Sequence, residues 1–243
     1  MTAVGLIPAR FAASRFPGKP LAPIAGRSMI QRVYEGAREA KSLRAVIVAT
    51  DDLRIADACR AFGAEVAMTR SDHQSGSDRI GEVAAKLDDE IVVNIQGDEP
   101  LMRGFVVDAA VDALREDADV PIATVVHPLD PAHRDDPNRV KVVLDHRGRA
   151  LYFSRASIPY PRDPKVAGPL WQHVGLYAYR RDFLLRFIRM APTFAERSEC
   201  LEQLRALEHG HEIRCAVVGG WRSVAVDVPG DVALVEAALR ERG

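Results

Sequence analysis

The chain has 243 residues, of which 47% are apolar and 28% charged, and its 33 basic and 34 acidic side chains give a net charge of −1. This composition is typical of a globular protein and argues against a disordered chain, a coiled coil and a nucleic-acid-binding protein that depends on bulk positive charge. No apolar run approaches the roughly 20 residues of a membrane span, the start is expected to form a strand rather than a secretory signal, and the cysteines form no CxxC pair. We therefore expect a cytoplasmic protein whose partners include neither nucleic acid nor a membrane.

The first half of the chain alternates strand and helix patterns. Short apolar runs predict strands that are covered on both faces, and apolar positions three or four residues apart predict helices. In chain order we expect strand 4–9, helix 29–40, strand 45–49, a helix capped by Asp51 or Asp52 that ends at 62, strand 65–68, helix 77–87, strand 91–96, helix 105–114 and strand 122–126. Such alternation gives a parallel sheet, whose ligands bind beyond the carboxyl ends of the strands. This rule selects the loops after Ala9, Ala49 and Gln96.

The second half is expected to contain more antiparallel pairing. Segments 140–144 and 150–153 flank the hairpin turn Asp145-His146-Arg147-Gly148, and 174–179 alternates like another strand. Helices are expected at 182–189, 199–207 and 231–240. The pattern predicts an α/β fold with a mostly parallel central sheet flanked by helices. We expect one domain, residues 1–243, with a smaller β-rich lobe at about 138–180.

Three cations follow the first strand within ten residues. Arg10, Arg15 and Lys19 lie beyond its carboxyl end, and Gly18 permits a tight turn close to a ligand. Two guanidinium forks and one point charge suit a polyphosphate, although a solvated basic loop is the alternative interpretation. Lys19 is followed by Pro20 and no GxGxxG follows the strand, which argues against a Walker A ATPase and a dinucleotide-dependent dehydrogenase.

Two aspartates are candidate metal ligands. Asp98 follows the strand 91–96 directly, beside Gly97, and a carboxylate in that place suits a hard cation such as Mg²⁺. A turn aspartate that caps the next helix is the alternative. Asp227 follows the apolar-alternating stretch 223–226. Together they could hold a metal that neutralises a transferring phosphoryl group, but the sequence leaves open whether they meet.

Two further groups are candidates for recognition of smaller ligands. Gln74, Ser75 and Gly76 precede a helix, where backbone N–H groups and small side chains can bind a base edge or a ribose; a helix cap by Ser75 or Ser77 is the alternative. His73 has no second histidine nearby and is not expected to bind metal. In the second half, arginine and histidine suit a carboxylate, and glutamate and glutamine suit sugar hydroxyls. Spacing alone does not select the members of this group, which are Arg155, Arg162, His173, Tyr177, Glu202 and Gln203.

Seven strings, in this order, resemble the 3-deoxy-manno-octulosonate (Kdo) cytidylyltransferases, also called CMP-Kdo synthetases. They are IPARFAASRFPGKPL (7–21), TRSDHQSGSDR (69–79), VNIQGDEPLM (93–102), NRVKVVLD (138–145), ALYFSRASIPYPR (150–162), HVGLYAYR (173–180) and LEQLRALEHG (201–210). The resemblance covers almost the whole chain. It implies a nucleotide-sugar transferase-like fold and a homodimer formed through the smaller lobe. It also implies CTP and Kdo as substrates, Mg²⁺ as cofactor, and CMP-Kdo and pyrophosphate as products, for lipopolysaccharide biosynthesis.

The resemblance also implies roles for individual residues. For CTP binding it implies Ala9, Arg10, Arg15, Lys19, Gln74, Ser75, Gly76, Arg79 and Gln96. For catalysis it implies Lys19, Arg15, Asp98 and Asp227, of which Asp98 and Asp227 are the metal ligands. For the sugar acid it implies Arg162, His173, Tyr177, Glu202 and Gln203.

Two departures from the family pattern keep alternatives open. The string AVDVPGD (225–231) replaces the family's GVDTPED, so Asp227 is kept while the cap of the following helix changes. The tract 168–172 is short, which leaves amino-Kdo or a sialic-acid-type sugar as the alternative acid. A CTP-binding module without turnover is a further alternative. A generic sugar-1-phosphate nucleotidyltransferase is disfavoured, because Arg162 and His173 suit a carboxylate better than a phosphate ester.

Overall fold

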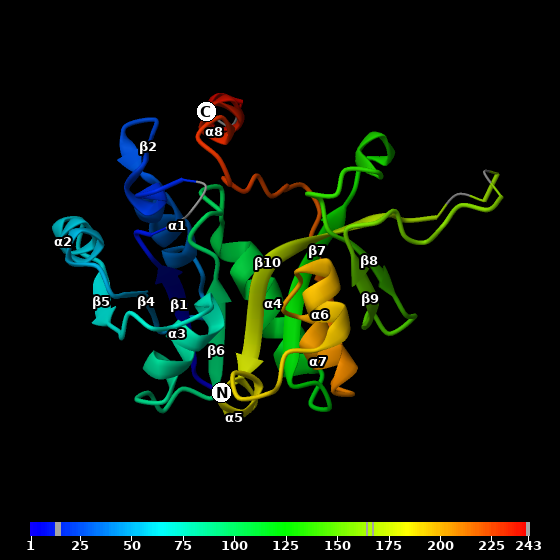
Figure 1. Cartoon of the computed structure of the whole chain (residues 1–243), viewed down its shortest axis with the longest axis horizontal. Helices are drawn as coiled ribbons and strands as arrows, with labels where there is room; N and C mark the ends of the chain where they lie inside the picture. The colour runs from blue at the N-terminus through cyan, green and yellow to red at the C-terminus, as the bar shows by residue number, and fades with distance from the viewer. Residues whose placement is uncertain (13–15, 164, 167, 242–243) are drawn as a thin grey trace. The chain divides into compact units, whose positions relative to one another are not determined.

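The computed structural model describes residues 1–12, 16–163, 165–166 and 168–241. The chain divides into two compact units (Figure 1). Unit 1 consists of Met1–Asp108 and Ser223–Gly243, and unit 2 of Ala109–Arg222. Among the described residues, none of the helices combines the length and the apolar character that crossing a bilayer requires. The expectation of a single domain with a β-rich lobe stays a prediction.

Unit 1 is built on a parallel sheet. Its strands, in spatial order, are β6 (Ile91–Ile95), β1 (Ala3–Ala9), β4 (Ala45–Thr50) and β5 (Glu65–Met68). Each neighbouring pair is parallel. Almost every residue of β1, β4 and β6 is buried, which explains why these strands are continuous apolar runs in the sequence. Because the strands are parallel, the loops that follow β1 and β6 leave the sheet at the same edge.

Helices cover the strands of unit 1. Their contacts pair α1 with β1 and β4, α2 with β4 and β5, and α3 with β1, β4 and β6. Ser28, Asp52 and Ser75 cap α1, α2 and α3 with side-chain oxygens that accept backbone N–H bonds, so the sequence-predicted caps at Asp52 and Ser75 are confirmed. The remaining bounds are η1 (Lys19–Leu21), β2 (Pro23–Ile24), β3 (Arg27–Ser28), α1 (Met29–Arg38), α2 (Leu53–Ala61), α3 (Gly76–Ala84), α4 (Gly104–Glu116), which crosses the boundary between the units, and α8 (Asp231–Arg240).

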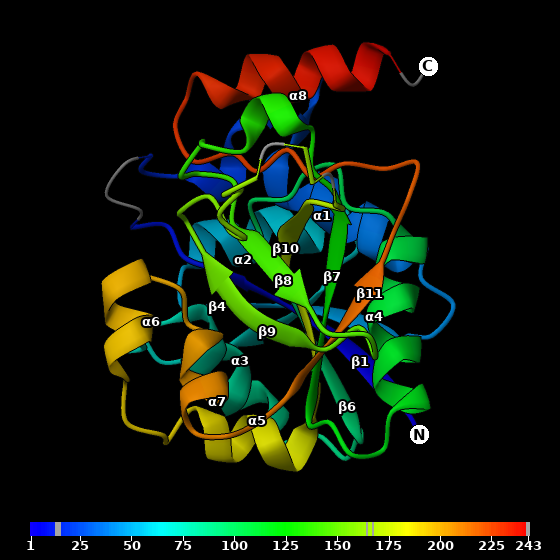
Figure 2. The same ribbon diagram turned by 90° about the vertical axis from the view of Figure 1, so that its right-hand side faces the viewer.

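Unit 2 centres on β7 (Ile122–Pro128). β11 (Ile213–Val217) runs parallel to it and β10 (Trp171–Arg180) antiparallel. β8 (Lys141–Leu144) pairs with β10 and with β9 (Ala150–Ser154). Together, β8 and β9 form the predicted hairpin (Figure 2). The helical elements are η2 (Pro131–His133), α5 (Arg181–Phe187), α6 (Phe194–Glu199) and α7 (Leu204–Glu208).

The predicted fold class, a mostly parallel sheet flanked by helices with additional antiparallel strands, is confirmed. The helix predicted at 199–207 is confirmed only in its second half, as α7. Cys200 has a φ of 52°, a left-handed conformation that ends α6 before α7 begins. The elements that the sequence did not predict include β11 and the helix α6. The apolar alternation of 223–226 does not form a strand; this segment is irregular.

Candidate active site

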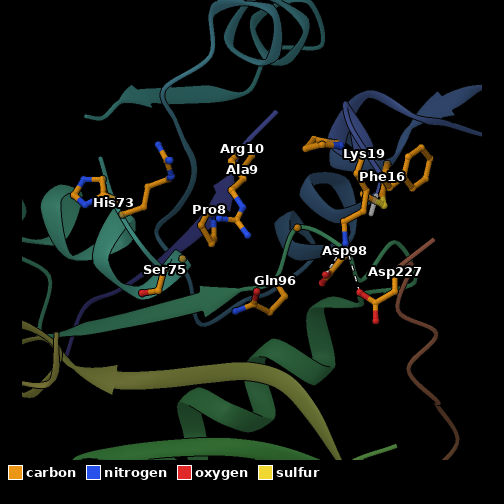
Figure 3. A pocket seen from close by; sticks show the side chains of 15 residues that line it. Pro8, Ala9, Arg10, Phe16, Lys19, His73, Ser75, Gln96, Asp98 and Asp227 are labelled. Carbon is orange, nitrogen blue, oxygen red and sulfur yellow. Dashed lines mark hydrogen bonds and ion pairs between the residues drawn. The ribbon is translucent and has the colours of Figure 1, made fainter. Parts of the chain in front are cut away.

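A pocket in unit 1 opens at the carboxyl ends of β1 and β6 (Figure 3). Pro8, Ala9 and Arg10 reach it from β1, and Gln96 and Asp98 from the end of β6. The loops approach closely because glycines lie between them. A Cβ on Gly97 would lie 3.1 Å from the carbonyl oxygen of Pro8, and one on Gly76 3.1 Å from the Pro8 ring. The loops predicted after Ala9 and after Gln96 therefore meet, as the parallel sheet requires.

One end of the pocket is ionic. The Lys19 ammonium donates to Asp98 Oδ2 at 2.9 Å and to the carbonyl oxygen of Val226 at 2.7 Å. It also lies 4.0 Å from Asp227 Oδ1 (Figure 3). The side chain of Lys19 is 16% exposed and that of Asp227 is 47% exposed, so water and ligands have access to this group from the Asp227 side. The structure thus settles what the sequence left open, because Asp98 and Asp227 meet around one cation.

The turn before η1 brings Lys19 to this position. Gly18 adopts a φ of 73° and donates its N–H to the carbonyl oxygen of Phe11 at 2.9 Å. A Cβ at Gly18 would also lie 3.2 Å from the Phe11 ring, so a side chain is disfavoured on both counts. The Arg54 guanidinium stacks on the Phe11 ring, 3.3 Å from the ring centroid. Arg15, between Phe11 and Gly18 in the sequence, lies outside the described residues.

A buried carboxyl lies behind the ionic end. Glu99 follows Asp98 and is 4% exposed. The pKa of Glu99 is raised to about 8, mainly by burial and in part by the charges of Asp98 and Asp227, while the hydrogen bond from Ser223 opposes the rise. Sequence analysis did not single out Glu99 or Ser223. Their only signal is proximity to the two candidate aspartates.

The other end of the pocket is formed by small and neutral groups. Ser75 forms a capping box with Asp78, in which Ser75 Oγ accepts the Asp78 N–H and Ser75 N donates to Asp78 Oδ2, both at 3.1 Å. The helix-cap interpretation of Ser75 is therefore confirmed, and the same residue lines the pocket with Gly76. His73 also lines it and contacts Glu82 Oε2 at 2.7 Å, which lowers the pKa of Glu82 to about 2. Gln74 is exposed and donates to the carbonyl oxygen of Asp72; it does not line the pocket.

Arg79 lines the pocket but its charge is already matched. Its guanidinium lies 3.0 Å from Asp51 Oδ1 and donates to Thr69 Oγ1 and to the carbonyl oxygen of Arg70. The residue is 4% exposed. These contacts join the loop that follows β4 to the loop that follows β5. Arg79 therefore stabilises the fold at this place, independently of any contact with a ligand.

The ionic end fits a divalent cation such as Mg²⁺. Two carboxylates already surround one positive charge, the Lys19 ammonium, which occupies the position of a cation between them. Across the described part of the chain, no group of three or more His, Cys, Asp or Glu side chains could hold a metal. A site with two protein carboxylates is typical of Mg²⁺, which takes its other ligands from substrate phosphates and water.

The residues predicted to bind the sugar acid lie in unit 2, and four of them are neighbours. His173 and Tyr177 on β10 have ring centroids 5.3 Å apart, and the charge of Glu202 contributes to the raised pKa of Tyr177. Gln203, adjacent to Glu202, has a buried Nε2 atom without a hydrogen-bond partner among the described residues. His173 lies 3.0 Å from Thr124 Oγ1, and burial lowers its pKa to about 3, so its ring is neutral near pH 7.

Arg162 is placed differently. It lies in the irregular stretch 155–163, which follows β9, and its side chain is exposed. Its contact with a substrate carboxylate stays a prediction. Arg155, which sequence analysis also considered, donates to the carbonyl oxygens of Glu199 and Pro137 and so ties β9 to α6 and to the segment before β8.

Comparison with known proteins identifies the family. The family model "Cytidylyltransferase" matches residues 4–213. The 3-deoxy-manno-octulosonate cytidylyltransferase of Syntrophotalea carbinolica is 52% identical and covers 99% of each chain. The enzyme of the same name from Solibacter usitatus is also 52% identical, over 98% of this chain and 94% of the relative. The chain belongs to the 3-deoxy-manno-octulosonate cytidylyltransferase family.

Solved structures agree with membership of the 3-deoxy-manno-octulosonate cytidylyltransferase family. A structure of CMP:2-keto-3-deoxy-manno-octonic acid synthetase complexed with CTP superposes with a TM-score of 0.94, at 43% identity and full coverage of both chains. A cytidylyltransferase from Leptospira borgpetersenii superposes with a TM-score of 0.66 at 15% identity. The second likeness concerns the fold alone, whereas the first accompanies high sequence identity over the whole chain.

Proposed function

We propose that this chain transfers the cytidylyl group of CTP to the 2-hydroxyl of Kdo, releasing pyrophosphate and forming CMP-Kdo for lipopolysaccharide biosynthesis. The observation that carries the proposal is the ionic end of the pocket, Lys19 with Asp98 and Asp227, in a chain that is 52% identical over its length to a 3-deoxy-manno-octulosonate cytidylyltransferase. Charged groups of both signs are what a metal–triphosphate substrate needs.

The two ends of the pocket favour one orientation of CTP. The triphosphate would lie toward Arg10 and Lys19, with Arg15 as a further cation from the same loop. The cytidine would lie toward Ser75 and Gly76, where the amino end of the nine-residue helix α3 and small side chains offer hydrogen bonds without net charge. Ala9 and Gln96 lie between these ends and complete the walls.

Asp98 and Asp227 would hold Mg²⁺, which supplies positive charge to the phosphate oxygens and acidifies the attacking hydroxyl. In the reaction, the oxygen of the sugar hydroxyl forms a bond to the α-phosphorus of CTP, and the bond from that phosphorus to the bridging oxygen of pyrophosphate breaks. The hydroxyl proton leaves to solvent. No covalent enzyme intermediate is required, so the chain acts by positioning and by electrostatic stabilisation. The Lys19 ammonium and the arginines stabilise the charge that develops on the departing pyrophosphate.

The sugar acid would be bound by the group in unit 2. A neutral His173, the Tyr177 hydroxyl and the Gln203 amide are suited to hydroxyl groups rather than to a charge. Because His173 is neutral, the positive charge for the substrate carboxylate is assigned to Arg162, and Glu202 accepts hydrogen bonds from sugar hydroxyls. The unpartnered Gln203 amide supports a role in binding, because a buried amide without a partner is unfavourable until a ligand fills the place.

We also propose a cytoplasmic homodimer that forms through the β-rich lobe. Leu151 is 62% exposed and Tyr152 is 39% exposed, and both lie on β9, whose described pairing is to β8. Exposed apolar side chains on a strand at a sheet edge favour contact with a second chain. Sedimentation of the purified chain, compared with a Leu151→Asp variant, tests this part of the proposal.

A coupled assay of pyrophosphate release tests the reaction itself. The chain is supplied with CTP, Mg²⁺ and one acid from a panel of Kdo, an amino-substituted Kdo and a sialic acid. We expect the highest kcat/KM with Kdo. A higher kcat/KM with the amino analogue would replace the named substrate and keep the reaction. Binding of CTP without pyrophosphate release with any acid would favour a nucleotide-binding module instead.

A further inference from the structure

The segment that carries Asp227 to the pocket has no regular structure of its own. Residues 223–230, called the strap below, connect unit 2 to α8 and are neither helix nor strand. A strand is held in place by a ladder of backbone hydrogen bonds along its length. The position of Asp227 therefore depends on a small number of individual contacts at the two ends and the middle of the strap.

The first end is attached to the turn that carries Asp98. Ser223 Oγ lies 2.6 Å from Glu99 Oε1 and 2.7 Å from Glu99 Oε2, and its hydroxyl donates to this carboxyl group. Both residues are buried, with exposures of 9% for Ser223 and 4% for Glu99. Because Glu99 follows Asp98 in the chain, this contact fixes the start of the strap relative to the first candidate metal ligand.

The middle of the strap is held by backbone and apolar contacts. The N–H of Val226 donates to the carbonyl oxygen of Asp98 at 2.9 Å, and its own carbonyl oxygen accepts from Lys19. The side chain of Val226 is fully buried in an apolar cluster with Met29, Leu101 and Val235. These contacts fix the residue before Asp227, but not the peptide that follows it.

The second end is held by Asp231, the first residue of α8. Its Oδ2 atom accepts the N–H of Asp227 at 2.8 Å and the N–H of Val228 at 2.9 Å. The N–H of Asp231 donates back to the carbonyl oxygen of Val228 at 3.0 Å. One carboxylate oxygen therefore orients the two peptide groups on either side of the Asp227 side chain.

We infer that Asp231 is a positioning residue that holds the Asp227 carboxylate against Asp98 and Lys19, and that Glu99 and Ser223 do the same from the other end of the strap. The inference deepens the proposed function and rests on it in one respect, the assignment of Asp227 as a cation ligand. It concerns three residues to which the family resemblance gave no role.

Mn²⁺ alone, followed by electron paramagnetic resonance on the intact nucleotide-free chain, provides a readout that is separate from turnover. Loss of a carboxylate that accepts two backbone N–H bonds is expected to weaken Mn²⁺ binding about tenfold in Asp231→Ala. Asp231→Asn keeps an oxygen acceptor and is expected to stay within about threefold of the wild type. In the assay of pyrophosphate release, the Mg²⁺ concentration for half-maximal rate should follow the same order, while KM for CTP at saturating Mg²⁺ is unchanged.

A double-mutant cycle separates positioning from a general loss of stability. On an Asp227→Asn background, Asp231→Ala is expected to cause no further loss of Mn²⁺ affinity, because the carboxylate that it positions is gone. Asp145→Ala is the matched control. Asp145 Oδ1 also accepts two backbone N–H bonds, from Arg147 and Arg149 at 2.8 Å each, in the β8–β9 turn of unit 2. This variant is expected to bind Mn²⁺ as the wild type does.

Thermal unfolding establishes whether each variant is folded. If Asp231→Ala does not fold, the test uses Ser223→Ala and its conservative partner Ser223→Thr. A loss of Mn²⁺ affinity of about threefold is then expected only in the alanine variant. Unchanged Mn²⁺ affinity in a folded Asp231→Ala chain overturns the inference. Equal losses on the wild-type and Asp227→Asn backgrounds overturn it too. A wild-type chain that releases no pyrophosphate with any acid would overturn the proposed function instead, and the Mn²⁺ comparison would still decide the role of Asp231.

Discussion

The ionic end of the pocket in unit 1 is formed by charged side chains, whereas the environment of His173 and Tyr177 in unit 2 favours neutral ones. Lys19, Asp98 and Asp227 form ion pairs at a partly exposed site. His173 and Tyr177 lie among aromatic rings and are almost fully buried, and burial shifts both of their pKa values toward the neutral form. One group is suited to bind and stabilise charge, and the other to recognise hydroxyl groups by hydrogen bonds.

The difference teaches that residue type alone is a weak guide to the role of a polar side chain. His173 was predicted to bind a carboxylate and Arg79 to bind CTP, but His173 is neutral where it lies and Arg79 already has Asp51 as its partner. Lys19 also has partners, but they are carboxylates whose side chains are 31% exposed at Asp98 and 47% exposed at Asp227. His173, Arg79 and Lys19 differ in how exposed they and their partners are, and in whether a group of opposite charge lies beside them.

Substitution of Asp98 is expected to have the largest effect, because it removes one carboxylate from the ionic end of the pocket. Asp98→Asn keeps the size of the side chain and removes the charge that pairs with Lys19. We expect turnover to fall at least about a hundredfold, because a metal carboxylate contributes a few kcal/mol to lowering the barrier. The measurement is pyrophosphate release at saturating CTP, Kdo and Mg²⁺, with the melting temperature as a check on folding. Near wild-type turnover would remove Asp98 from the metal site.

Lys19→Ala is expected to have the next largest effect. Loss of the ammonium should lower kcat/KM for CTP about thirtyfold, because its charge acts more strongly as pyrophosphate departs. Lys86→Ala is a matched control, since Lys86 is an exposed lysine that pairs with Glu82 one helical turn away. Equal kinetic constants for Lys19→Ala and the wild type would favour the alternative interpretation, in which the loop that carries Lys19 is a solvated basic turn without a role in CTP binding.

Arg162→Ala sharpens the assignment in unit 2. If Arg162 is the cation that faces the substrate carboxylate, its removal should raise KM for Kdo about tenfold, while KM for CTP changes less than about twofold. Steady-state kinetics with each substrate varied in turn makes the comparison. A change in KM for CTP alone would contradict this part of the site.

The neutral state of His173 predicts a modest effect of pH on stability. Its pKa in the folded chain is about 3 and its usual value is 6.5, so the unfolded chain binds more protons between these values. Stability is therefore lost as the pH falls below about 6.5, by up to about 1.4 kcal/mol per unit. Melting temperatures at pH 7.5 and pH 5 should show a drop that is smaller by a few degrees in His173→Gln. Equal drops in both chains would mean that the ring is not desolvated.

The parallel part of the fold and the ionic end of the pocket were accessible from the sequence. The strands β1, β4 and β6 are largely apolar and buried, and the rule that ligands bind at the carboxyl ends of parallel strands placed Lys19 and Asp98 at the same edge. The contact of Asp227 with them was not accessible, because the alternation at 223–226 forms no strand and so no place in the sheet fixes the path of the strap.

The remaining differences have local causes. The helix predicted at 199–207 begins only at Leu204, because α6 ends at Cys200, whose left-handed φ of 52° is uncommon for a residue other than glycine. The pairing of Arg79 with Asp51 depends on β4 lying next to β5, which the sequence did not specify. The low pKa of His173 depends on Phe153 and Thr124, which reach it from other strands of unit 2.

The Lys19 ammonium between the two aspartates has a consequence for the order in which ligands bind. A divalent ion that approaches the nucleotide-free chain meets a positive charge that is already paired with Asp98. In the proposed site, the triphosphate of CTP would offer the Lys19 ammonium another anion, and movement of the ammonium toward it would free the carboxylates for the metal. Each ligand would then raise the affinity of the other, and thermodynamic linkage requires the two factors to be equal. The proposal therefore predicts that Mn²⁺ alone binds more weakly than Mn²⁺ together with CTP.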